Sequence, residues 1–145
     1  MADALKGLRA GAELATQQRT PDAVDLFQFS AAIWLTHRIH YDAPYTTEVE
    51  GHPGLPVHGP LQAVYLEQLV RGDLESRLGA RVRLVRYRYR HVAPAYVGQT
   101  LVCRGRVRSV DGDRVTCEVW AEVDERRTTI GELTMAVALS RIMSA

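Results

Sequence analysis

The 145-residue chain lacks the features that mark several large classes of protein. Its formal net charge is only +1, which gives little bulk attraction to nucleic acid or to a membrane surface. No apolar run approaches the roughly 20 residues that a membrane-spanning helix needs. The opening residues, MADALKGLRAGAELA, contain no long apolar segment and do not look like a signal peptide. We therefore expect a cytoplasmic protein with no nucleic-acid partner and no membrane association.

Cysteine is also scarce, since only Cys103 and Cys117 occur, in separate strand-like segments. Neither belongs to a Cys-x-x-Cys pair or to a Cys/His spacing typical of a metal site, and an isolated cysteine often serves as a small buried hydrophobe. We expect two reduced thiols in the core and no bound metal. Internal repeats, a phosphate-binding glycine loop and a Ser-His-Asp order are likewise missing.

What is present is the composition of an ordinary globular protein, with 46% hydrophobic and 24% charged residues. The length suits one domain with a real core, so we predict a single domain over residues 1–145. Residues 1–11 are expected to be a frayed start, or a short helix closed by Gly11.

A first helix is predicted to start at Thr20 and Pro21, a cap residue followed by a residue that suits the first helical position. Apolar residues then recur at helical spacing over residues 24–34. This helix is expected to end near Leu35.

A second, longer helix is predicted from Gly59 and Pro60 to a stop within residues 72–79. Its apolar residues cover more than one face. A helix of that kind is surrounded by the rest of the protein rather than lying at its surface.

The remaining chain alternates like strands, and Asp111-Gly112-Asp113 is a strong hairpin signal. One early strand is expected at 12–19, and the later ones at 82–92, 100–110, 114–123 and 128–139. The order predicts an α+β fold in which a long central helix is wrapped by an antiparallel sheet of about five strands.

Residues 34–61, which we call the histidine segment, contain four of the five histidines: His37, His40, His52 and His58. Glycine and proline are interspersed among them, and the apolar helix follows. A loop rich in titratable side chains on a rigid scaffold is where binding and catalytic groups concentrate. We predict that the active site lies here.

The motifs H-R-I-H-Y-D at 37–42 and E-G-H-P-G-L-P-V-H-G-P-L at 50–61 resemble the MaoC-like hydratases and dehydratases of the hotdog fold. They are most similar to the mesaconyl-CoA and itaconyl-CoA hydratase branch. R-Y-R-Y-R-H-V-A-P-A-Y-V-G-Q-T-L at 86–101 continues the resemblance, which covers residues 20–140. It implies a single hotdog domain and a hydro-lyase that hydrates an α,β-unsaturated acyl thioester, or dehydrates the 3-hydroxyacyl thioester. Coenzyme A or acyl carrier protein would be part of the substrate, with no further cofactor.

The broader family's motif is Asp-x-Asn-Pro-Leu-His, and its histidine corresponds to His40. The motif's aspartate then falls on Leu35. His40 is implied as the general base or acid, because an imidazole suits both roles near neutral pH. Asp42 is expected either to orient an imidazole or act as a second acid/base group, or to cap a short helix over 43–49. His37 either orients a water molecule or is simply solvated.

Three further features are predicted to bind substrate. Arg38 would pair with a carboxylate on the acyl group, or else with Asp42 or Glu48. His58 and Gly59 open the long helix, whose unpaired N–H groups and positive dipole end would polarise a thioester carbonyl. Glycine there would allow the ligand close to the main chain.

The arginines of the strand at 82–92, Arg86, Arg88 and Arg90, share one face and would meet coenzyme A phosphates, or form a solvated face. Tyr87 and Tyr89 are expected in the core or at a dimer contact. His52 and His91 are interpreted as structural.

Two other functions stay open from the sequence: a thioesterase using the same carbonyl site, and a non-catalytic acyl-thioester-binding subunit, which the missing motif aspartate favours. A lone sheet of about five strands leaves an edge exposed. We therefore expect a homodimer or a higher oligomer.

Overall fold

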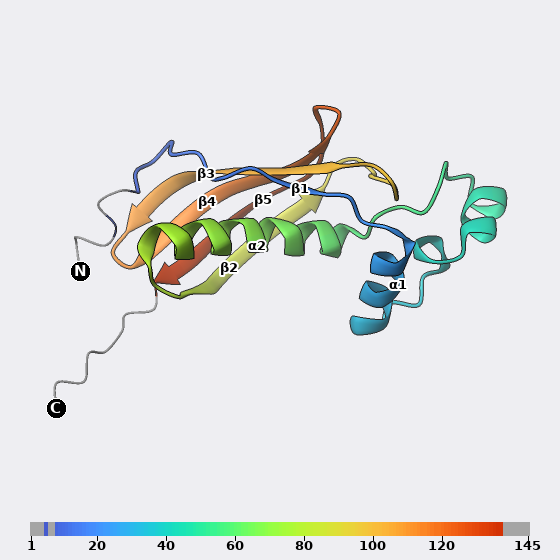
Figure 1. Ribbon diagram of the computed structural model, residues 1–145, viewed down its shortest axis with the longest axis horizontal. Helices are drawn as coiled ribbons and strands as arrows, with labels where there is room; N and C mark the ends of the chain where they lie inside the picture. The colour runs from blue at the N-terminus through green and yellow to red at the C-terminus, as the bar shows by residue number, and fades with distance from the viewer. Residues whose placement is uncertain (1–4, 6–7, 138–145) are drawn as a thin grey trace.

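A long helix lies along one face of a five-stranded antiparallel sheet in the computed structural model (Figure 1), which describes residue 5 and residues 8–137. The strand order is β1-β3-β4-β5-β2. The elements are β1 (Gln17–Arg19), α1 (Ala23–Ala32), α2 (Gly59–Leu78), β2 (Val82–His91), β3 (Leu101–Asp111), β4 (Arg114–Val123) and β5 (Arg126–Val137). This is the predicted α+β hotdog arrangement, with α2 as the central helix.

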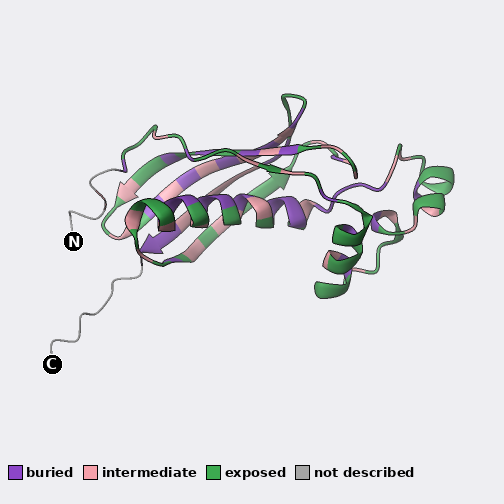
Figure 2. Cartoon of the chain, viewed as in Figure 1, coloured by how far each residue is buried: buried purple, intermediate pink, exposed green. Residues whose placement is uncertain are grey.

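Helix α2 begins and ends as its sequence predicts. Pro60 occupies the first turn, and Gly79 follows the last turn with a φ of 61°, a left-handed conformation that suits glycine. Its buried positions cover a wide surface: Leu61, Gln62, Ala63, Leu66, Leu69, Val70, Asp73 and Leu74. Figure 2 shows buried residues recurring along the length of α2.

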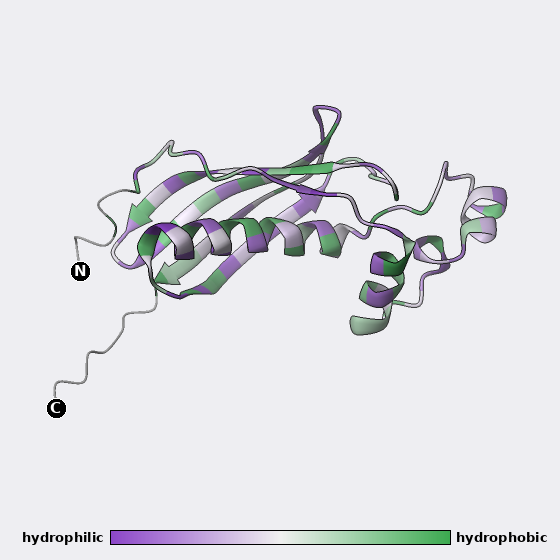
Figure 3. Ribbon diagram, viewed as in Figure 1, coloured by the Kyte–Doolittle hydropathy of each residue, from purple (hydrophilic) through white to green (hydrophobic). Residues whose placement is uncertain are grey.

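The sheet has one apolar and one charged face, and hydropathy alternates along its strands (Figure 3). Cys103 and Cys117 lie on the apolar face, buried and unpaired with each other, as the sequence predicted. On the other face Arg104 pairs with Glu122 across β3 and β4, and Arg106 is paired with a glutamate of β4 in the same way. The β3–β4 hairpin turns at Gly112, whose φ is 59°.

Helix α1 starts two residues later than predicted, at a different cap. Asp22 accepts hydrogen bonds from the N–H groups of Val24 and Asp25, while the Asp25 side chain accepts from Asp22 N–H. The hydroxyl of Thr20 instead forms a hydrogen bond with that of Thr100. A carboxylate beside free helical N–H groups is the stronger cap, so Pro21 ends up before the helix.

The apolar stripe of α1 does not face the core. Phe27 is 60% exposed and Trp34, just after the helix, is 86% exposed, whereas Leu26 and Ser30 are buried. Helical spacing predicted the helix but not the face that it buries.

Two boundaries differ at the ends of the chain. Only residues 17–19 of the predicted strand 12–19 form β1, and Glu13 adds an isolated bridge to Arg106. The prediction for residues 1–11 falls largely outside the described residues, as do positions 138 and 139 of the last predicted strand. Among the described helices, none has the length and apolar character to cross a membrane.

Candidate active site

The histidine segment lies at the N-terminal end of α2, beyond the ends of the strands and next to α1 (Figure 1). It contains two short helical turns, η1 (Arg38–His40) and the π-helical η2 (Tyr45–Val49). Because the segment ends in α2, it brings its side chains to the start of the central helix.

His40 is buried and held by the backbone. Its Nδ1 lies 2.8 Å from the carbonyl oxygen of Pro56. A carbonyl oxygen only accepts, so Nδ1 carries the hydrogen and the neutral ring has its lone pair on Nε2. Burial lowers the pKa of His40, although the bond to Pro56 opposes this shift. The ring is therefore neutral near pH 7, and Nε2 can accept a proton.

His58 packs directly against His40. The two rings are stacked, with centroids 3.8 Å apart and planes 20° from parallel. On the α1 side, Ser30 Oγ lies 2.8 Å from His58 Nε2 inside the protein. Burial, and then the neighbouring His40, lower the pKa of His58 to about 4. Ser30, His58 and His40 thus form a continuous buried polar row.

The second ring nitrogen of His58, Nδ1, is buried and has no hydrogen-bond partner among the described residues. Leaving such a group unpaired costs free energy, and in native proteins it usually has a reason. A polar group of a bound molecule, or a water molecule, would satisfy it.

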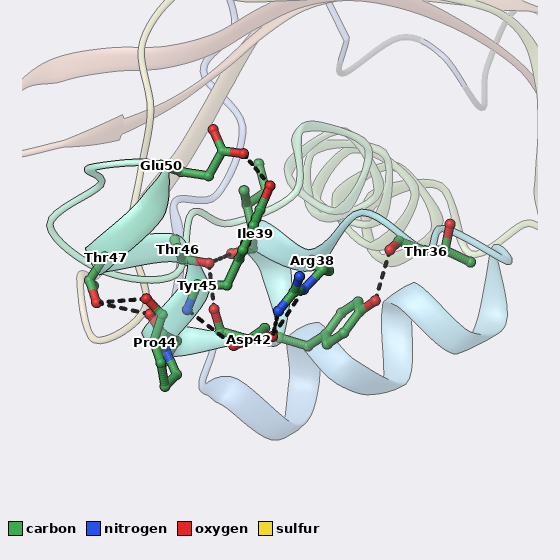
Figure 4. Close-up of polar contacts among 11 residues, drawn as sticks. Thr36, Arg38, Ile39, Asp42, Pro44, Tyr45, Thr46, Thr47 and Glu50 are labelled. Carbon is green, nitrogen blue, oxygen red and sulfur yellow. Dashed lines mark hydrogen bonds and ion pairs between the residues drawn. The ribbon is translucent and has the colours of Figure 1, made fainter.

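Asp42 does not contact either imidazole. Its carboxylate pairs with Arg38 at 2.7 Å and accepts a hydrogen bond from Tyr45 N–H at 3.1 Å (Figure 4). The ring of Tyr45 also lies under the Arg38 guanidinium, 4.0 Å away. The bond from Arg38, and then that from the Tyr45 backbone, lower the pKa of Asp42. It stays ionised, which suits the capping and ion-pair alternative rather than a general acid.

Asp42 and Tyr45 already engage the guanidinium of Arg38. A substrate carboxylate at Arg38 would share the guanidinium with Asp42. His37 is exposed and its ring meets that of His40 edge to face, at 5.9 Å between centroids. His37 thus lies beside His40 but outside the buried row.

Gly59, the first residue of α2, is in contact with His91 from the end of β2. A Cβ built on Gly59 would lie 1.9 Å from His91 Nε2. On its other side, His91 Nδ1 lies 2.9 Å from the hydroxyl of Thr129. Position 59 therefore has no space for a side chain while His91 holds this position.

Arg88 and Arg90 are not brought to this site within one chain. Tyr87 and Tyr89 line a cleft against α2, and side chains alternate along a strand, so the intervening arginines point to the opposite face of the sheet. Arg86 shares their face, and all three are exposed. No ion pair joins them to an acidic side chain within the part of the chain that the structure describes.

That cleft is open, mostly apolar and about 340 Å³ in volume. It begins at Pro60 in the first turn of α2, and Phe29 and Val64 form one wall while Leu84 and Tyr89 form the other. A smaller hollow of about 180 Å³ lies over α1, where Ser30 is part of its lining. The larger cleft includes Pro60, two positions after His58, and the smaller hollow includes Ser30, whose hydroxyl is hydrogen-bonded to His58.

Within the described ranges no group of three or more His, Cys, Asp or Glu side chains is arranged to hold a metal ion. Sequence reasoning missed Ser30 and His91. The signal for Ser30 was a small polar residue in the last turn of an apolar helix. For His91 it was the strand alternation, which places it on the same face as Tyr87 and Tyr89.

Comparison with known proteins assigns the family. The sequence profile described as hydroxyacyl-thioester dehydratase type 2 matches residues 6–97, more than half of the chain. A second profile, fluoroacetyl-CoA-specific thioesterase, matches residues 79–140, which is less than half.

The chain is 55% identical over 56 residues to a mesaconyl-C(4)-CoA hydratase of Chloroflexus aurantiacus; the match covers 39% of this chain and 20% of that protein. It is 29% identical over 101 residues to a mitochondrial hydroxyacyl-thioester dehydratase type 2 of Schizosaccharomyces pombe, over 69% of this chain and 33% of that protein. The chain thus spans a third or less of these two relatives.

The solved structure of an (R)-hydratase from A. caviae, involved in PHA biosynthesis, superposes with a TM-score of 0.79 and 18% identity, covering 92% of this chain and 99% of that one. At that identity the likeness shows the fold, and it confirms the hotdog prediction. Together with the profile match, it leads to one assignment. The chain belongs to the hydroxyacyl-thioester dehydratase type 2 family.

Proposed function

We propose that this protein catalyses the reversible addition of water to an α,β-unsaturated acyl thioester of coenzyme A or acyl carrier protein. The family assignment and the hydratase and dehydratase relatives support the reaction class. The observation that carries the proposal is His40, a buried neutral imidazole whose Nδ1 is held by Pro56 and whose Nε2 is free to accept a proton. No cofactor is needed for this chemistry.

In the hydration direction His40 Nε2 takes a proton from water as the oxygen bonds to the β-carbon. The electron pair of the double bond shifts toward the thioester, and negative charge develops on its oxygen. The first turn of α2 supplies N–H groups without helical partners and the positive end of the helix dipole. An oxygen at Gly59 would be stabilised there, as in other oxyanion sites.

The apolar cleft supports an acyl thioester as substrate. A thioester oxygen at the start of α2 would place the acyl chain or the pantetheine next to Pro60, where the cleft begins. Binding sites for small molecules are generally concave and mostly apolar with few polar groups. Arg88 and Arg90 remain predicted contacts for coenzyme A phosphates. Because these arginines lie on the face of the sheet opposite the cleft, the coenzyme A would have to extend round the edge strand to reach them.

We also propose that the working form is a homodimer or a higher oligomer. Strand β2 is an edge of the sheet along its whole ten-residue length. The apolar residues of α1 and its C-terminal end, Val24, Phe27, Ile33 and Trp34, are exposed close to the site. Exposed apolar patches beside an unpaired edge are typical of protein interfaces.

The test is direct incubation with crotonyl-CoA, mesaconyl-CoA and itaconyl-CoA. We expect loss of the enoyl absorbance and a product heavier by one water molecule in the mass spectrum. Binding of all three compounds without any turnover would contradict the proposal and favour a non-catalytic acyl-thioester-binding subunit.

A thioesterase is the second candidate, because the fluoroacetyl-CoA-specific thioesterase profile matches residues 79–140. That region contains β2 to β5 but none of the histidine segment. Release of free thiol, followed with a thiol reagent in the same incubation, would identify this activity. We expect none above the rate of spontaneous hydrolysis.

A further inference from the structure

The imidazole of His91, the last residue of β2, stands against the first residue of the central helix. A Cβ at Gly59 would lie 1.9 Å from its Nε2 and 2.3 Å from each adjacent ring carbon. The ring therefore lays its face, at the Nε2 end, over the helix start. His91 lies at the end of β2, well after Gly59 in the sequence. It nevertheless reaches the point where the thioester oxygen is proposed to bind.

A hydrogen-bond row fixes where the hydrogen of this ring lies. Thr128 and Thr129 both contact the side-chain oxygen Oε1 of Gln62, at 2.7 and 2.9 Å. An amide oxygen only accepts, so both hydroxyls donate to it. Gln62 Nε2 faces the carbonyl of Val57 at 3.5 Å, which agrees with this orientation of the amide.

The hydroxyl of Thr129 has a single hydrogen, and Gln62 receives it. Toward His91 it must accept, so His91 Nδ1 is the donor in their 2.9 Å bond. The neutral ring then has its lone pair on Nε2, in the ring plane and beside the start of α2.

Addition of water to an enoyl thioester needs two proton transfers, one at the water oxygen and one at the α-carbon. His40 provides for one, and Asp42 is engaged with Arg38 and the backbone. The α-carbon is bonded to the thioester carbon, so an oxygen bound at Gly59 places the α-carbon beside His91. On these grounds, and resting on the function proposed above, we infer that His91 is the second proton-transfer group of the site, serving the α-carbon.

In the dehydration direction His91 Nε2 accepts the α-proton, and the electron pair of the broken C–H bond moves into an enolate with its charge on the thioester oxygen. The enolate then expels the β-hydroxyl, which leaves as water with a proton from the His40 imidazolium. Hydration runs these steps in reverse: neutral His40 takes a proton from water, and the His91 imidazolium gives one to the α-carbon. At the start of either direction one of the two rings carries a proton, a minor protonation state because burial lowers the pKa of both His40 and His91. Exchange with solvent restores that state after turnover.

The ring is accessible for this role. His91 is exposed, and Tyr89, whose ring lies 5.5 Å away, lines the apolar cleft that begins at Pro60. The hydrogen bond to Thr129 uses only Nδ1 of His91. Nε2 is therefore left to exchange a proton with the substrate.

The test compares His91→Asn with the parent protein. The asparagine amide can still donate to Thr129 in place of Nδ1, but it has no counterpart of Nε2. We follow hydration of crotonyl-CoA and, in D2O, deuterium incorporation at the α-carbon of 3-hydroxybutyryl-CoA by mass spectrometry. We expect hydration to fall by about two to four orders of magnitude, the usual worth of general acid–base catalysis. The KM for crotonyl-CoA should stay within several-fold, and α-deuteration should fall with turnover.

Two variants separate this role from a structural one. His40→Asn should lose hydration yet keep α-deuteration of 3-hydroxybutyryl-CoA, because the enolate can form without expelling water. His52→Asn changes a histidine of the same segment outside the proposed machinery and should behave as the parent. Added imidazole should restore part of the activity of His91→Ala.

The outcomes are distinguishable. Parent-like hydration and α-deuteration in His91→Asn would overturn the role of His91 and leave the proposed function standing. A parent protein that hydrates none of the enoyl thioesters would overturn the proposed function itself.

Discussion

His40 and His58 stack face to face, with ring centroids 3.8 Å apart. Both rings are buried, so desolvation opposes protonation of either one, and the proximity of His40 further opposes protonation of His58. Each is held by a separate anchor, Pro56 for His40 and Ser30 for His58. The pair therefore stays neutral near pH 7, which is the state in which His40 can act as a base.

The first prediction concerns acid stability. The unfolded chain protonates the imidazole of His58 near its ordinary pKa of 6.5, but the folded protein does so only near 4. The free energy of unfolding should therefore fall as the pH drops from about 6.5 toward 4, and should not depend on His58 above that range. The loss is on the order of 3 kcal/mol at the acid end. Urea unfolding at several pH values measures it, with His58→Gln as the comparison. An equal pH dependence in parent and variant would contradict the assignment.

The second prediction concerns Ser30. Replacing it with alanine removes the hydroxyl that pairs with His58 Nε2 and leaves a second ring nitrogen without a partner. We expect a loss of roughly 1–3 kcal/mol in unfolding free energy, the cost of an unsatisfied buried polar group. Ser76→Ala, at an exposed position of α2, is the matched control and should change little. Thermal melts of the two variants test this, and equal midpoints would speak against the buried row.

The third prediction couples Gly59 to His91. In Gly59→Ala the new Cβ would overlap His91 Nε2, so the exposed ring must turn away and lose its bond to Thr129. We expect a cost of about 1 kcal/mol, the worth of one hydrogen bond. In a His91→Ala background the same glycine change should cost clearly less. A double-mutant cycle by chemical unfolding measures the coupling, and strictly additive effects would show that the two residues do not meet.

The fourth prediction concerns assembly. We expect light scattering at micromolar concentration to give at least twice the mass of one chain, because the β2 edge and the apolar surface around Phe27 and Trp34 are otherwise exposed. Trp34→Lys places a charge in that surface and should weaken the assembly. Val49→Lys, an exposed apolar position on η2, serves as the control. A clean monomer for the parent protein would refute the expected oligomer.

The main elements of the fold were predictable because their signals are local. The Gly59 and Pro60 start of α2 and the hairpin at residues 111–113 depend on backbone preferences that neighbouring residues express. The face of α1 was not predictable, because helical spacing cannot distinguish a stripe that faces the core from one left at the surface. Ser30, a polar residue, occupies the buried side there because it has a partner in His58.

The site was predictable only in part, and for a similar reason. His40 could be identified from its motif, but its proton position depends on the carbonyl of Pro56, which the chain brings back sixteen positions later. The alternatives for Asp42 depended on whether Arg38 would turn toward it. The contact of His91 with Gly59 joins the end of β2 to the start of α2, and no local pattern predicts it.

The central claim is that His40 is the base, and one measurement tests it most directly. His40→Asn keeps a side-chain N–H for Pro56 and removes the Nε2 lone pair, so the fold should remain while proton transfer is lost. We predict that kcat for hydration of the best enoyl-CoA substrate falls by about two to four orders of magnitude, with the thermal midpoint near that of the parent. A His40→Asn protein that turns over at a rate within a few-fold of the parent would contradict the account.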